Sequence, residues 1–353
     1  MGELDPVTRH ASRVTSVILS CLALGLVFWG GLQVDLPLAR FLRSIDLPWL
    51  VVAGDVGSRL GSGEVLAGIS GALLAFGLLS RRAVFRRAGL ESLIAHAAVA
   101  LSTQALKHLI GRPRPRMTHS GWFQFGPSWD SGLDSFPSGH AAASFAVAAV
   151  LARRFPSAGW VLYGAACFVA LSRVLRGSHF PTDVLAGVGL GLAAGYVVAN
   201  PIHAWRSSLS AALKESTPYL VGAFALLWTA VNAAPDRWLS TIMFSVGACG
   251  VVVGAGHQLA WSLGVYRRSR WNEVLRPLAT PLVVMGLAAA TTSWLVMSLT
   301  VLLVMARWQE IRGSGLSPSV PQPMHPLAEL TLATGLVLAL VAIQTVKGML
   351  PLL

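Results

Sequence analysis

The chain has 353 residues, of which 54% are hydrophobic and only 12% are charged. A soluble protein carries about twice that charged fraction, so the composition excludes a soluble globular protein. The apolar residues come in long runs, which indicates an all-α polytopic membrane protein. The formal net charge is +12. The basic residues fall in short loops and not on one soluble face, which argues against a nucleic-acid-binding protein.

Apolar runs of the length of a membrane-spanning helix recur along the chain. Residues 35–60, which contain Pro37 and Pro48, are predicted to form a loop or a helix lying at the membrane interface. The run at 278–306 is counted as one tilted helix, although the Thr-Thr-Ser stretch at 291–293 could mark a break. About ten transmembrane helices are therefore expected, at residues 16–34, 63–80, 90–110, 139–154, 158–176, 183–200, 217–234, 239–265, 278–306 and 327–347.

Basic residues in the loops predict the orientation of these helices, because such residues accumulate on the cytoplasmic side. If both termini are cytoplasmic, four basic loops lie on the inner side: 81–87, 153–154, 206–214 and 267–276. The loops at 35–62, 111–138, 177–182 and 235–238 then lie on the non-cytoplasmic side. Basic residues also occur in and beside this second group of loops, and a catalytic role explains that exception.

Three polar motifs stand at the edges of apolar runs on the predicted non-cytoplasmic side. Residues 107–115 contain the pattern K-x6-R-P, residues 137–140 read P-S-G-H, and residues 172–183 read S-R-x5-H-x3-D. Ionisable side chains beside a membrane segment are energetically costly, so they usually serve a function. The three motifs are therefore the candidate functional site.

The three motifs resemble those of the type 2 phosphatidic acid phosphatase superfamily, the lipid phosphate phosphatases, in the same order and without a substitution. The resemblance covers about the first 200 residues. It implies that residues 1–200 form a six-helix phosphatase core. Residues 201–353 lie outside it and are predicted to form an extension of about four further transmembrane helices, with no assigned role.

The resemblance implies distinct roles for two histidines. His179 would attack phosphorus and become phosphorylated, and His140 would protonate the leaving alkoxide. Asp183 lies four residues after His179. At the start of a helix its carboxylate is expected to accept one ring N–H of His179 and leave the other ring nitrogen free to attack, as in a serine triad.

Five further motif residues are predicted to bind the phosphate. Arg114 and Arg173 can bind phosphate oxygens in bidentate fashion, and Lys107 adds a point charge. Ser138 adds a hydroxyl, and Gly139 lets its backbone N–H come close at the start of a helix, where anions are favoured. The sequence has no carboxylate cluster suited to a metal ion, so neither a metal nor another cofactor is expected.

Several other polar residues near the motifs receive no catalytic role. Thr182 is interpreted as a hydroxyl at the start of a helix. Five residues are interpreted as lying in the phosphate field or at the interface: Arg112, Arg116, Arg176, His108 and His119.

Cys167 and Arg173 have the C-x5-R spacing of the cysteine-dependent phosphatases. That chemistry needs a glycine-rich turn that offers backbone N–H groups. The residues between this pair form an apolar helical run whose N–H groups are already bonded. The cysteine mechanism is therefore rejected.

The motifs leave the reaction and the substrate open. Candidate substrates are polyprenyl diphosphate, phosphatidylglycerol phosphate, phosphatidic acid and a lipid-linked glycan phosphate. A phosphotransferase could use the same phosphohistidine, and a phosphatase core could also be fused to a lipid transport module. The expected partners are the lipid phosphate and the cell membrane, with the active site facing the non-cytoplasmic side, and no nucleic acid. The oligomeric state is open.

Overall fold

The computed structural model describes residues 6–44, 47–117, 127–130, 132–231, 237–262, 279–291 and 294–314. Within these ranges the regular elements are helices, with one isolated β-bridge, which confirms the predicted all-α class. The helix predicted at 327–347 lies outside the described residues. The chain divides into two compact units, Gly31–Ala212 and a second unit formed by Met1–Gly30 with Leu213–Leu353.

The N-terminal helix extends further than the sequence predicts. Helix α1 spans Pro6–Ser44 and contains Pro37. The loop predicted for residues 35–60 is therefore wrong for residues 35–44, which are helical. Membrane helices tolerate an internal proline when neighbouring groups satisfy the freed backbone. The alternative prediction of a helix within residues 35–60 agrees with α2, which spans Pro48–Leu60. Its proline, Pro48, lies in the first turn, where proline is favoured.

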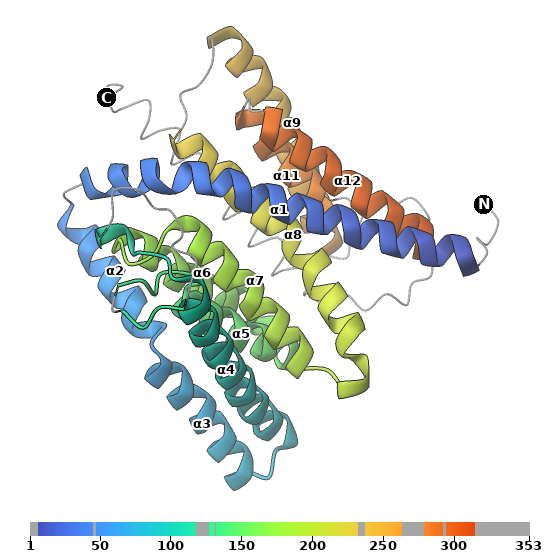
Figure 1. Ribbon diagram of the computed structural model, residues 1–353. Coiled ribbons are helices and arrows are strands. Elements are labelled where there is room, and N and C mark those ends of the chain that lie inside the picture. The colour runs from blue at the N-terminus through green and yellow to red at the C-terminus, as the bar shows by residue number, and fades with distance from the viewer. Residues whose placement is uncertain are drawn as a thin grey trace. The chain divides into compact units, whose positions relative to one another are not determined.

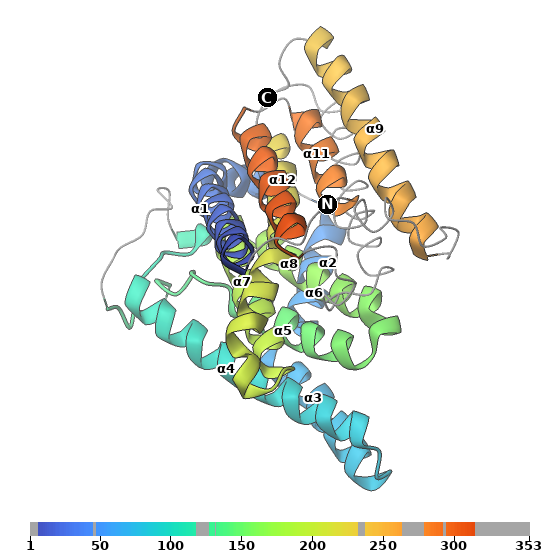
Figure 2. The same cartoon turned by 90° about the vertical axis from the view of Figure 1, so that its right-hand side faces the viewer.

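Helices α3 (Gly63–Leu79) and α4 (Ala83–Ile110) follow with a short connection. They lie side by side in both views (Figures 1 and 2). Helix α3 meets α2 at a bend of 47°. The predicted spans at 63–80 and 90–110 are therefore both helical, and α4 carries the first motif to its C-terminal end.

Helix α5 (Gly139–Arg154) is the central element of the Gly31–Ala212 unit, and every residue from Ala141 to Leu151 is buried. It packs against α4, against α6 (Gly159–Leu175) and against α7 (Pro181–Val198). The contact with α7 is close because glycines at four-residue spacing face α5. A Cβ added at Gly187 would lie 2.5 Å from the carbonyl oxygen of Ser138, the N-cap of α5. A Cβ added at Gly191 would lie 2.3 Å from the carbonyl oxygen of Ala142 in α5.

Four further helices are described after α7: α8 (Trp205–Val231), α9 (Arg237–Ser262), α11 (Ala279–Thr291) and α12 (Trp294–Ser314). Helices α9 and α11 pack against each other (Figure 2). The single tilted helix predicted over 278–306 is wrong, because two helices occupy this stretch. Helix α11 ends at Thr291 and α12 begins at Trp294, so the division falls at the Thr-Thr-Ser stretch that the sequence offered as a possible break.

Four segments among the described residues are long and apolar enough to cross a membrane: Val14–Leu42, Ala83–Ile110, Pro156–Leu175 and Pro181–Val198. The bent pair α2–α3 makes a fifth if it counts as one span. Helix α5 has 16 residues, fewer than the about 20 that a full crossing needs. The predicted class of polytopic membrane protein is thus confirmed, while α5 is better described as an enclosed central helix.

Candidate functional site

The three motifs meet at neighbouring helix ends. Lys107 lies in the last turn of α4 and Arg173 in the last turn of α6. His140 is the second residue of α5, and Asp183 lies in the first turn of α7. Ser138, the N-cap of α5, donates its backbone N–H to the Asp183 carbonyl at 2.9 Å, which joins the starts of α5 and α7.

A tight turn between α6 and α7 places His179 next to Arg173. The carbonyl of Arg173 accepts hydrogen bonds from the backbone N–H groups of Ser178 (3.1 Å) and His179 (3.3 Å). Gly177 has φ +60°, a left-handed conformation that favours glycine after a helix. The turn therefore accounts for a glycine between the arginine and the histidine of the third motif.

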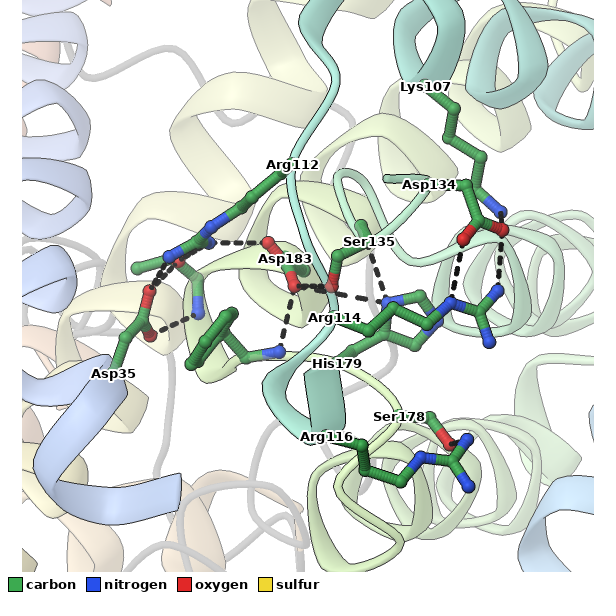
Figure 3. A network of polar contacts seen from close by, with 12 residues as sticks. Asp35, Lys107, Arg112, Arg114, Arg116, Asp134, Ser135, Ser178, His179 and Asp183 are labelled. Carbon is green, nitrogen blue, oxygen red and sulfur yellow. Dashed lines mark hydrogen bonds and ion pairs between the residues drawn. The ribbon is translucent and has the colours of Figure 1, made fainter. Parts of the chain in front are cut away.

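The ring of His179 is buried and oriented by a backbone carbonyl (Figure 3). Its Nδ1 lies 2.7 Å from the carbonyl oxygen of Ser135. Because a carbonyl only accepts, Nδ1 must carry the proton, and Nε2 keeps its lone pair. Burial lowers the pKa of His179 well below its ordinary value, the charges of Arg173 and Lys107 lower it further, and the bond to Ser135 opposes them. His179 is thus neutral near pH 7.

The predicted hydrogen bond between His179 and Asp183 is wrong. Nδ1 of His179 and Oδ2 of Asp183 are 3.9 Å apart, too far for a hydrogen bond. Oδ2 of Asp183 accepts instead from Ser135 Oγ at 2.6 Å and from the backbone N–H of Phe180 at 2.8 Å. A carboxylate in the first turn of a helix is well placed for such an N–H. Asp183 is therefore linked to His179 through Ser135, whose hydroxyl bonds the carboxylate and whose carbonyl bonds the ring.

A buried ion network lies behind Asp183, and the interpretation of Arg112 as a field or interface residue is wrong. Arg112 is 1% exposed. Its Nη1 lies 2.5 Å from Asp183 Oδ1, and its Nη2 lies 2.7 Å from Oδ2 of Asp35 on α1. Thr182 does more than start a helix, because its hydroxyl accepts from Arg112 at 2.8 Å and its backbone N–H donates to Asp35 at 3.0 Å. The guanidinium also stacks over the Phe180 ring.

Two of the predicted phosphate-binding residues, Arg173 and Ser138, each have a buried polar atom that makes no hydrogen bond in the described part of the chain. Arg173 donates through Nη1 to Ser58 Oγ. Its Nε, and the hydroxyl of Ser138, are buried with no hydrogen-bond partner among the described residues. A buried polar group without a partner calls for an explanation. A bound phosphate oxygen would supply an acceptor for both groups.

Gly139 lies at the first position of α5, partly exposed. A Cβ added there would meet only Thr103 Oγ1, at 3.7 Å, which is an ordinary contact. Packing within the described residues therefore does not require glycine here. Close approach of a ligand to the backbone remains the prediction for this position.

The remaining predicted cations, Lys107 and Arg114, face Asp134 (Figure 3). Arg114 donates from Nε at 2.8 Å and from Nη2 at 2.6 Å to the two carboxylate oxygens of Asp134. Lys107 Nζ lies 3.9 Å from the same carboxylate. The sequence analysis did not single out Asp134, because its position depends on how the loop before α5 folds back.

His140 is half-buried at the start of α5, and its ring has no hydrogen-bond partner within the described part of the chain. Burial, and then the charges of Arg173, Lys107 and Arg114, lower the pKa of His140 to about 4, so its ring is neutral near pH 7 in the free site. The same three cations lower the pKa of His179. Both histidines therefore lie in one cationic field. The role of His140 as proton donor stays a prediction.

The other polar residues near the motifs hold the surrounding loops. Arg176 forms an ion pair with Asp55 at 3.2 Å, and Arg116 Nη2 lies 3.4 Å from Ser178 Oγ. His108 Nδ1 lies 2.9 Å from the carbonyl oxygen of Ser128. His119 lies outside the described residues. Cys167 lies within the helical run of α6, as the rejection of the cysteine mechanism assumed.

Fold and site together define a class of protein: a polytopic helical membrane protein with a buried, neutral histidine inside a cationic cluster at its helix ends. Residues 88–207 match the model of the PAP2 superfamily. This segment contains all three motifs, so the resemblance to the type 2 phosphatidic acid phosphatases is confirmed.

Relatives with known names also match part of the chain. The chain is 34% identical to lipid A 1-phosphatase of Rhizobium johnstonii over 140 residues, which is 39% of this chain and 48% of the relative. It is 39% identical to lipid A 1-phosphatase of Rhizobium etli over 93 residues, 26% of this chain and 40% of the relative. It is 34% identical to decaprenylphosphoryl-5-phosphoribose phosphatase of Mycobacterium tuberculosis over 129 residues, 35% of this chain and 64% of the relative.

The chain thus spans about half the length of the lipid A 1-phosphatases that it matches, or less. No solved structure matches it.

Proposed function

We propose that this protein is a metal-independent phosphatase that removes a phosphate group from a membrane lipid through a phosphohistidine at His179. One observation carries the proposal. The Ser135 carbonyl fixes the proton of His179 on Nδ1, so the lone pair of Nε2 is available inside a cluster of cations. The similarity to proteins named as phosphatases of lipid A and of a decaprenyl-linked phosphate supports a lipid-linked phosphate as the substrate.

In the first chemical step, Nε2 of His179 forms a bond to phosphorus as the bond between phosphorus and the lipid oxygen breaks. Lys107, Arg114 and Arg173 stabilise the charge on the phosphoryl oxygens. His140, neutral in the free site, takes up a proton when the negative charge of the bound phosphate offsets the nearby cations, and it gives this proton to the leaving oxygen. The ring of His179 becomes positively charged, and the Ser135 carbonyl and the carboxylate of Asp183, 3.9 Å away, stabilise that charge.

In the second step, water attacks the phosphohistidine, the P–N bond breaks, and inorganic phosphate leaves. His140, neutral after the first step, accepts the proton of the water. The site lies at helix ends of a membrane protein, which suits a substrate whose tail stays in the bilayer. The distribution of basic residues over the loops supports the non-cytoplasmic side of the cell membrane for this end of the helices.

The test is phosphate release from purified lipid phosphates by the full chain in detergent. The panel contains a lipid A phosphate, a decaprenyl-linked phosphate, polyprenyl diphosphate, phosphatidylglycerol phosphate and phosphatidic acid. We expect release from at least one lipid and none with His179→Gln. Release that survives this substitution, or no release from any lipid, would contradict the proposal. Transfer of phosphate to a second lipid without free phosphate would indicate a phosphotransferase.

Activity should survive a chelator. Lys107, Arg114 and Arg173 supply the positive charge that a metal ion provides in other phosphatases. We expect the rate of phosphate release in excess EDTA to stay within about twofold of the untreated rate, and orthovanadate to inhibit. An activity that EDTA removes and magnesium restores would contradict the proposed mechanism.

Labelling should place the site outside the cytoplasm. In a chain whose native cysteines Cys21, Cys167 and Cys249 are replaced by alanine, Asp130→Cys should react with a membrane-impermeant maleimide in intact cells. Arg81→Cys, in the loop between α3 and α4, should react only after the membrane is opened. Reaction of Arg81→Cys alone in intact cells would invert the proposed topology.

A further inference from the structure

Asp134 is an acidic residue inside the cluster that is proposed to bind the phosphate, and the three motifs do not include it. Both of its carboxylate oxygens are bonded to Arg114, at 2.8 Å and 2.6 Å, and Lys107 Nζ lies 3.9 Å away. The side chains of Asp134 and Arg114 are 34% and 28% exposed, so the pair is only partly buried. Asp134 is therefore a counter-charge to the phosphate-binding cations.

The backbone holds Asp134 in this position. The carbonyl of Arg112 accepts from the N–H of Ser135 at 2.9 Å, and the N–H of Arg114 donates to the carbonyl of Gly132 at 2.9 Å. These bonds pair residues 132–135 with the K-x6-R-P motif in a short parallel bridge. Partial burial raises the pKa of Asp134, but hydrogen bonds from Arg114 and the charges of Arg114 and Lys107 outweigh it and hold the pKa below its usual value. Asp134 is thus ionised at neutral pH.

Asp134 leaves Arg114 able to bind a phosphate. A guanidinium has five N–H donors, and Asp134 uses one on Nε and one on Nη2. Within the described ranges the two Nη1 donors and the second hydrogen of Nη2 have no other acceptor, so they can bind a substrate oxygen. The carboxylate can therefore stay in place while phosphate binds, and its negative charge stays in the site.

We propose that Asp134 determines substrate choice by lowering the positive charge of the site, so that the site prefers a lipid phosphomonoester over a lipid diphosphate. Lys107, Arg114 and Arg173 contribute three positive charges, and Asp134 removes one. A phosphomonoester carries about two negative charges near neutral pH, and a diphosphate carries one more. The proposal rests on the proposed function, because it concerns the specificity of the same site.

The test compares Asp134→Asn with the unchanged protein on one pair of substrates, a polyprenyl phosphate and a polyprenyl diphosphate with the same tail. Asparagine keeps the size and one oxygen acceptor for Arg114 but removes the charge. The ratio of kcat/KM for diphosphate to kcat/KM for monophosphate should rise about five- to tenfold, as expected for one charge acting on one further charge at a partly exposed site. The effect should shrink with added salt.

Asp130→Asn is the matched control, since Asp130 lies in the same loop and is exposed, and the hydrogen bond of its carboxylate among the described residues is with Ser128. The ratio of kcat/KM for the diphosphate to kcat/KM for the monophosphate should be the same in Asp130→Asn as in the unchanged protein. An unchanged or lower ratio in Asp134→Asn would overturn the proposal, even with full phosphatase activity on both substrates.

A binding measurement separates this proposal from the proposed function. Calorimetry with inorganic phosphate and with pyrophosphate needs no turnover. Asp134→Asn should gain more affinity for pyrophosphate than for phosphate, and equal changes would overturn the proposal. If no lipid phosphate is hydrolysed, the proposed function fails, and the calorimetry still shows whether Asp134 sets the charge preference of the site.

Discussion

Substitution of His179 by alanine is expected to lower phosphate release by about a thousandfold or more, because it removes the proposed nucleophile. The Ser135 carbonyl that orients the ring can only accept a hydrogen bond, so it cannot replace the imidazole as nucleophile. The measurement is kcat on the best lipid phosphate, with His203→Ala as the control. His203 is exposed in the turn before α8, and its substitution should leave kcat unchanged. A His179→Ala variant that is folded and active would contradict the assignment.

His140→Ala should behave differently, because His140 is proposed only to move a proton. General-acid catalysis contributes about 10²- to 10⁴-fold, and it matters most for a poor leaving group. The defect of His140→Ala should therefore shrink with a nitrophenyl ester, whose leaving group needs no proton. An equal defect on alkyl and nitrophenyl substrates would argue against His140 as the acid.

Among the substitutions considered, Arg112→Ala is expected to lower the free energy of unfolding the most. It would leave the buried carboxylates of Asp35 and Asp183, 1% and 0% exposed, without their shared cation. Breaking a buried ion pair in this way costs about 3–5 kcal/mol. The midpoint of thermal unfolding in detergent should fall well below that of the unchanged protein.

Arg59→Ala is the control for Arg112→Ala, since Arg59 is exposed in the last turn of α2. Its unfolding midpoint should be unchanged. Arg112→Lys should restore only part of the loss, because an ammonium group cannot reproduce the two directed contacts of the guanidinium to Asp35 and Asp183. An Arg112→Ala variant as stable as the control would show that the network contributes little.

The predicted helices and the described ones agree best where apolar runs end at strong local signals. Residues 139–154 were predicted as a helix and are one, because Pro137 and Gly139 mark its start and Arg153 and Arg154 its end. The prediction failed at residues 35–44, where Pro37 was interpreted as a loop signal although it lies inside α1. Whether a helix tolerates such a proline depends on the groups that pack against it. The sequence of one segment does not show which groups these are.

The candidate site shows the same limit. The motif spacing was enough to select His179 and Arg173, which are separated by five residues and are brought together by the turn after α6. Asp35 and Arg112 are 77 positions apart, and no local pattern predicts their pairing. The spacing of His179 and Asp183 allowed a direct hydrogen bond, but the backbone N–H of Phe180 and the hydroxyl of Ser135 bind that carboxylate instead.

The most direct test of the proposed mechanism is to trap the phosphoenzyme. The protein is mixed with a lipid carrying labelled phosphate, quenched rapidly without acid, digested, and analysed by mass spectrometry for the peptide that contains His179. The mechanism predicts labelled phosphate on His179 and none in the His179→Ala variant. Labelled phosphate on His140 or Cys167 instead would contradict it.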